Sequence, residues 1–92
     1  MIRSFRHRGL ELFFTKSDLR KIPSDRAARI ERLLDRLEAA ERPADMNLPG
    51  YRWHQLKGDR KGTHAVDVSG NLRLTFKFDG GNAFDIDLED YH

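Results

Sequence analysis

The sequence of 92 residues contains no cysteine, so it offers neither disulfide bonds nor thiolate ligands for zinc. No apolar run approaches the roughly 20 residues that a membrane-spanning helix requires. The basic segment at residues 1–6 lacks the apolar stretch of a signal peptide. We therefore expect one domain over residues 1–92, located in the cytoplasm and without a membrane partner.

The net charge of +2 is unevenly distributed along the chain. Residues 1–42 hold 11 of the 17 Lys and Arg residues and 7 of the 15 Asp and Glu residues, which leaves residues 43–92 with a net charge of −2. The basic half suits contact with nucleic-acid phosphates. It equally suits the solvated side of helices, and charge alone leaves both interpretations open.

Apolar spacing predicts two helices in the basic half. The first follows His7, where three apolar residues recur at i, i+3 and i+4: Leu10, Phe13 and Phe14. The second begins near Ser24, a potential N-cap, and ends before Pro43. Its core-facing stripe is Ala27, Ile30, Leu34 and Leu37.

The opposite side of the second helix carries four arginines, which are candidate contacts to nucleic-acid phosphates: Arg26, Arg29, Arg32 and Arg36. The same helix offers two ion pairs with i,i+4 spacing, Asp25 with Arg29 and Glu38 with Arg42. The alternative is that all four arginines simply face solvent and contact no nucleic acid.

After Gly50 the apolar period changes to two, which predicts antiparallel strands over residues 51–56, 63–68, 72–78 and 84–88. Residues 2–5 indicate a weak additional strand. Within residues 72–78 the apolar side chains alternate with Arg73, Thr75 and Lys77, and we expect Phe84 in the last strand to face the core. Two helices followed by such strands indicate an α+β fold with the helices on one face of the sheet.

Polar side chains capable of acid–base chemistry occur in three clusters: His54 with Lys57 and Arg60, Asn71 to Arg73, and Asp90-Tyr91-His92. Two imidazoles can take and give a proton near neutral pH, and cations beside them can stabilise a charged phosphate. Simpler explanations exist, because a histidine in a strand is often structural and Arg73 can pair with Asp85 or Asp87 across strands. The histidines and carboxylates form no recognisable metal spacing, so we expect no metal and no cofactor.

Five spaced segments together resemble the HigB toxins of the RelE/ParE superfamily, from the first residue to the last: residues 1–5, 47–54, 56–62, 71–76 and 90–92. The resemblance implies a RelE-like fold with two N-terminal helices packed on one face of a small, mostly antiparallel sheet. It implies a metal-independent endoribonuclease of a type II toxin-antitoxin system, which cleaves translated mRNA in the A site of the 70S ribosome. The partner would be a HigA-type helix-turn-helix antitoxin, through which alone the toxin would meet operator DNA.

The resemblance also implies site residues. The expected catalytic set is His54, Asp90, Tyr91 and His92. Phosphate contacts are expected from Lys57, Arg73 and Arg60. On a ribosome, the four arginines of the second helix become candidate contacts to ribosomal RNA. Relatives often carry an aromatic residue at the positions of Leu72 and His64, and we interpret His64 as a half-buried structural residue.

Two other functions fit parts of the sequence. One is a ParE-like toxin that inhibits a topoisomerase, although such a binder has no need of clustered proton donors. The other is a non-catalytic nucleic-acid-binding module, which requires the arginine side of the second helix to contact phosphates directly.

Overall fold

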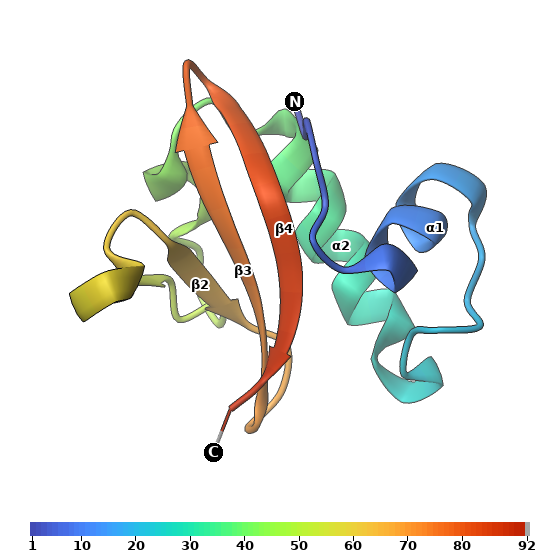
Figure 1. Cartoon of the computed structure of the whole chain (residues 1–92). Coiled ribbons are helices and arrows are strands. Elements are labelled where there is room, and N and C mark those ends of the chain that lie inside the picture. Colours follow the sequence, from blue (N-terminus) through green and yellow to red (C-terminus); the bar gives the residue numbers. More distant parts are fainter. Residues whose placement is uncertain (92) are drawn as a thin grey trace.

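The computed structural model describes residues 1–91, and His92 lies outside the described residues. Two helices precede a four-stranded antiparallel sheet in the order β1-β2-β3-β4 (Figure 1). The elements are α1 (Arg8–Lys16), α2 (Ala27–Ala39), β1 (His54–Gln55), β2 (His64–Asp67), β3 (Leu72–Asp79) and β4 (Asn82–Asp90). This arrangement confirms the predicted α+β fold.

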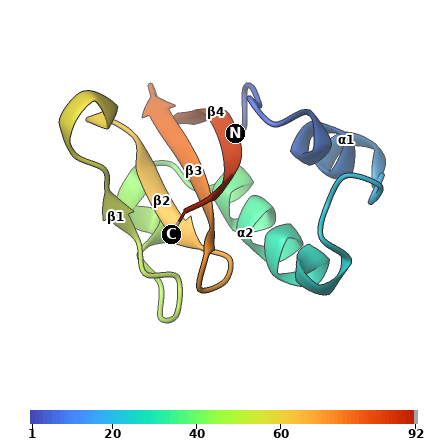
Figure 2. The same ribbon diagram turned by 60° about the horizontal axis from the view of Figure 1, so that its bottom comes forward.

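The core lies between α2 and one face of the sheet. Three residues of the predicted α2 stripe are buried, Ile30, Leu34 and Leu37, and Ala27 is half-buried. They belong to the same core cluster as Leu74 and Phe76 of β3. Figures 1 and 2 show α1 beside α2, beyond the β4 edge, so α2 provides most of the cover. Within residues 1–91 no helix is both long and apolar enough to cross a bilayer.

The segment before α1 covers the outer edge of β4. Isolated parallel bridges pair Ile2 with Ala83 and Phe5 with Ile86. The predicted strand over residues 2–5 is therefore reduced to two bridges, and these make the sheet mostly rather than wholly antiparallel. The N–H of Ile2 also donates to Glu38 Oε1 at 2.8 Å, so Glu38 is used here and the predicted pair with Arg42 is absent.

The start of α2 differs from the prediction. Ser24 opens a 3₁₀ turn, Ser24–Arg26, and its side chain caps nothing, while α2 itself begins at Ala27. Asp25 Oδ2 lies 4.0 Å from Arg26 Nε, and the predicted pair of Asp25 with Arg29 does not form. Arg29 is drawn toward the sheet, where its Nη2 donates to the carbonyl of Gly50 at 2.8 Å and that of Asp67 at 3.0 Å.

The strand predicted over residues 51–56 is only His54–Gln55 long. Arg52 adopts a φ of +54°, a left-handed conformation that interrupts an extended strand. The following turn contains a 3₁₀ segment, Gly58–Arg60. The charged residues of this turn therefore lie beside the short edge strand β1.

A β-bulge separates the two halves of the β3–β4 ladder. Thr75 pairs with Asp87 but Lys77 pairs with Phe84, so β4 holds one extra residue. The extra residue reverses the side-chain parity, and Phe84 lies on the same face as Lys77. The expectation that Phe84 faces the core was wrong because a single inserted residue turns the strand over.

Candidate active site

The face of the sheet opposite α2 carries two rows of paired residues. One row consists of His54, Ala65, Thr75 and Asp87, and the next consists of Asp67, Arg73 and Glu89. His54 lies two strands from Thr75, roughly 10 Å away. We call this surface the polar face. It gathers His54 and Arg73, which are 19 positions apart in the chain.

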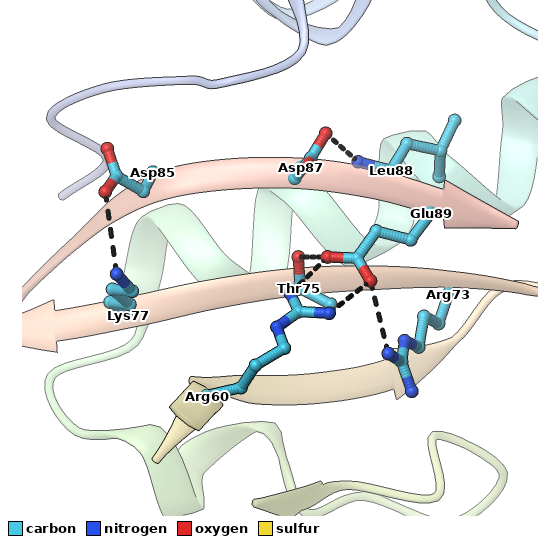
Figure 3. A network of polar contacts seen from close by, with 8 residues as sticks. All are labelled: Arg60, Arg73, Thr75, Lys77, Asp85, Asp87, Leu88 and Glu89. Carbon is cyan, nitrogen blue, oxygen red and sulfur yellow. Dashed lines mark hydrogen bonds and ion pairs between the residues drawn. The ribbon is translucent and has the colours of Figure 1, made fainter. Parts of the chain in front are cut away.

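The Glu89 carboxylate occupies the centre of the polar face (Figure 3). Arg60 donates to both of its oxygens, with Nη1 to Oε1 at 2.8 Å and Nη2 to Oε2. Arg73 Nη2 donates to Oε1 at 3.2 Å, and the hydroxyl of Thr75 donates to Oε2 at 2.9 Å. The Arg60 hydrogen bonds, assisted by Thr75 and Arg73 and opposed by burial, lower the pKa of Glu89 to about 2.

Arg73 is held on two sides. Its guanidinium lies over the ring of Tyr91, 4.4 Å from the centroid, and pairs with Glu89. The side chain is 15% exposed. Its buried Nε donates to none of the described residues. Arg73 therefore has a fixed guanidinium, whose planar fork suits contact with a phosphate.

Tyr91 and His54 are connected through Asp67 and Arg52. The Tyr91 hydroxyl donates to Asp67 Oδ1 at 3.2 Å, and Arg52 Nε lies 3.2 Å from Asp67 Oδ2. Burial, and then the Asp67 charge, raise the pKa of Tyr91, so the phenol keeps its proton. The left-handed Arg52 in turn presents its carbonyl to His54 Nδ1 at 2.9 Å.

The tautomer of neutral His54 follows from this contact. A carbonyl oxygen only accepts hydrogen bonds, so Nδ1 must carry the proton and Nε2 becomes the proton acceptor. The side chain is exposed on the polar face. In this form the imidazole presents a basic nitrogen to solvent.

The structure places two of the remaining predicted site residues, Lys57 beside the polar face and Asp90 on the other side of β4. Lys57 is exposed immediately before the turn Gly58–Arg60. Asp90 pairs with Leu72 and so points to the opposite side of β4 from Glu89, and its Oδ1 accepts from Asn71 Nδ2 at 3.3 Å. His92 lies outside the described residues, so its position relative to His54 stays a prediction.

The arginines of α2 do not form one uniform surface. Arg26, Arg32 and Arg36 are exposed, whereas Arg29 is half-buried over the ring of Tyr51, 4.9 Å from its centroid. Together with its bonds to two carbonyls, this contact makes Arg29 a structural link between α2 and the sheet. The other three remain candidates for contact with RNA.

Two further histidines have structural roles. His64 is buried between Trp53 and Phe76, with ring centroids 5.8 and 5.6 Å away, and burial lowers its pKa. It is more buried than the predicted half-buried residue, and it stays neutral. His7 Nδ1 accepts the N–H of Leu10 and caps α1. Among residues 1–91, no three His, Asp or Glu side chains are grouped so that they could hold a metal ion.

Comparison with known proteins identifies the family. The model of the RelE-like toxin of the type II toxin-antitoxin system HigB matches residues 3–92. The chain belongs to this family of toxins. It is 39% identical to the endoribonuclease HigB of Proteus vulgaris over 92 residues, which cover both chains completely. It is 32% identical to the toxin HigB-1 of Vibrio cholerae over 91 residues, 97% of this chain and 96% of that one.

Membership of a type II system means that the toxin has an antitoxin partner. The structure adds site residues that the sequence analysis did not single out: Arg52, Asp67, Thr75 and Glu89. The sequence did contain a signal for Glu89, because the alternation of side chains along a strand places Glu89 on the same side of β4 as Asp87. The pairing of Glu89 with Arg73 became visible only with the strand register.

Proposed function

We propose that this toxin is an endoribonuclease that cleaves mRNA on the ribosome without a metal ion. The central support is the cation-rich polar face, where Arg73 is held by Glu89 and Tyr91 beside the row that carries His54. The relative from Proteus vulgaris bears the name endoribonuclease, which favours the same activity here. The toxin would act in the cytoplasm.

The reaction requires a proton acceptor near the ribose. His54 Nε2 would take the proton of a 2′-hydroxyl, whose oxygen attacks the adjacent phosphorus. As the O2′–P bond forms, the P–O5′ bond breaks, leaving a 2′,3′-cyclic phosphate and a 5′-hydroxyl. The departing O5′ needs a proton, and we assign that donation to His92 from the sequence resemblance.

The phosphate gains negative charge in this step. The guanidinium of Arg73 and the ammonium of Lys57 would stabilise that charge. Arg60 holds Glu89 and adds positive charge beside the site. Asp90 would orient a histidine, and Tyr91 would hold Arg73 and contact the substrate. The proposed ribosome contacts are Arg26, Arg32 and Arg36, which are exposed on and beside α2.

The proposed partner of the toxin is a HigA-type antitoxin with a helix-turn-helix domain, and operator DNA would be reached only through it. Mixing the purified toxin with the HigA-type antitoxin tests the pairing. A complex that suppresses cleavage is expected, and the absence of a complex would contradict it.

Mapping the 5′ ends of cellular mRNA after brief induction tests the activity. The wild type should produce cuts inside translated regions that follow the reading frame. His54→Asn and Arg73→Ala should abolish them. Arg20→Ala should not, because Arg20 is exposed and pairs with nearby Asp18, away from the polar face.

Other outcomes would contradict the proposal. Growth arrest without frame-dependent cuts would favour a topoisomerase-inhibiting toxin. Cuts that persist in His54→Asn would show that the imidazole has no part in proton transfer. Cleavage that requires added divalent metal would overturn the metal-independent step.

A further inference from the structure

A second part of the polar face lies outside the proposed catalytic centre. Lys77 is four residues along β3 from Arg73, roughly 14 Å in an extended strand. Figure 3 shows Lys77 and Asp85 at one end of the strands, separate from the group around Glu89. Phe84 pairs directly with Lys77, so the two side chains are neighbours on this face. We call these three residues the Phe84 end.

The bulge that turns Phe84 onto the polar face contains a residue in the left-handed conformation. Asp85 has a φ of +53°, which residues other than glycine rarely adopt. Ser4 stabilises this conformation, because its Oγ accepts the N–H of Asp85 at 2.9 Å. Strained backbone and bulges occur preferentially beside functional sites. Here the strain has a definite result, since it places a half-buried aromatic ring among polar side chains.

A cavity of about 170 Å³ opens beside the Phe84 end, far more than one water molecule needs. Its lining consists of three cationic side chains, two carboxylates and two hydroxyls: Arg6, Arg60 and Lys77, Asp59 and Asp85, and Thr63 and Thr75. The cations outnumber the carboxylates, and the ring of Phe84 lies beside the cavity rather than in its lining. Arg60 and Thr75 also contact Glu89, so the cavity adjoins the catalytic centre. A strand of RNA bound at Arg73 would therefore reach it by continuing along β3.

The chemistry of the Phe84 end suits a nucleotide. Proteins bind single-stranded RNA by stacking bases on aromatic rings and by placing cations along the backbone. Lys77 Nζ lies 3.9 Å from Asp85, and both side chains are about 40% exposed. Such an ion pair is weak, so Lys77 can exchange Asp85 for a phosphate.

We propose that the Phe84 end and its cavity bind a nucleotide of the RNA that flanks the scissile phosphate. The base stacks on Phe84, and its phosphate contacts Lys77 and Arg6. This inference rests on the proposed ribonuclease function, since it extends the same RNA strand. It makes Phe84 a substrate-binding residue distinct from the catalytic set.

The test uses two RNAs whose scissile nucleotide carries a 2′-deoxyribose, which prevents cleavage. One is a dinucleotide that spans the scissile phosphate, and the other is a pentanucleotide that extends beyond it on both sides. Their dissociation constants are measured by chemical-shift titration of the isotope-labelled protein. Phe84→Leu removes the ring at similar size, Lys77→Gln removes the charge, and Lys16→Gln is a remote charge control on α1.

The wild type should bind the pentanucleotide more tightly than the dinucleotide. Phe84→Leu and Lys77→Gln should each weaken pentanucleotide binding about tenfold and leave dinucleotide binding unchanged. Lys16→Gln should change neither constant. Equal pentanucleotide affinity in the wild type and both Phe84-end variants would overturn the flanking site. A wild type that binds neither RNA, or an Arg73→Ala variant that binds both normally, would instead overturn the proposed RNA site itself.

Discussion

Replacing Glu89 with glutamine tests the central ion network. The pKa of Glu89 falls from 4.5 to about 2, chiefly through Arg60. At about 1.4 kcal/mol per pKa unit, this shift corresponds to about 3 kcal/mol of folding free energy. The carboxylate side chain is 19% exposed, so solvent screens it only in part. Glutamine also replaces one carboxylate oxygen, a hydrogen-bond acceptor, with an amide N–H donor that faces a guanidinium. We therefore expect Glu89→Gln to lower the free energy of unfolding by about 3 kcal/mol at pH 7.

The expected loss depends on pH in a defined direction. The folded-state pKa of Glu89 is below the unfolded-state value, so its stabilisation is complete above about pH 4.5 and disappears as the pH falls toward 2. The difference in unfolding free energy between wild type and Glu89→Gln should therefore shrink across this window. Asp18, whose pKa is also about 2, titrates in both proteins and cancels in the difference.

Urea denaturation followed by the fluorescence of Trp53, the single tryptophan, measures the effect between pH 7 and pH 2. Asp87→Asn is the matched control, because its carboxylate accepts from the adjacent Leu88 N–H and lies on the same strand. We expect it to change stability by no more than about 0.5 kcal/mol. A Glu89→Gln difference that stays constant with pH, or no destabilisation at pH 7, would refute the assigned network.

Three further variants separate structural from surface roles. Arg29→Ala should lower the free energy of unfolding by about 1–3 kcal/mol in urea denaturation, because two carbonyls lose their donor. The control Arg32→Ala should leave stability nearly unchanged, and equal losses in the two variants would contradict the structural role of Arg29. Leu34→Asp should yield no folded protein by circular dichroism, since it places a charge in the α2 core, and a cooperative melt would show the core is misassigned. Tyr91→Phe should lower the unfolding free energy by about 1 kcal/mol through the lost bond to Asp67, and an unchanged denaturation midpoint would exclude that bond.

Local patterns in the sequence were sufficient to predict that helices pack on one face of a sheet, and to predict many of the residues on the polar face. The stripe of α2 and the alternation of β3 each follow from one periodicity, so they fixed which side of each element is apolar. Arg73 was expected to point away from the core, and it does. The function was predicted from the family resemblance, before the structure was considered.

Contacts between distant residues decided the rest. Local alternation placed Phe84 in the core, but a bulge held by Ser4, 80 positions earlier, turned it outward. The alternative that Arg73 pairs with Asp85 or Asp87 was wrong in its partner, because the strand register places Glu89 beside Arg73. Arg29 looked like a surface residue until Gly50 and Asp67 brought their carbonyls to it.

Local sequence patterns were enough to predict the helices and strands, the apolar sides of α2 and β3, and the family. Tertiary structure alone decided which charges meet, because strand register and a single inserted residue depend on contacts that no short window contains. The clamp of Arg60 and Arg73 on Glu89 is the clearest case, since its three members come from a turn and two strands.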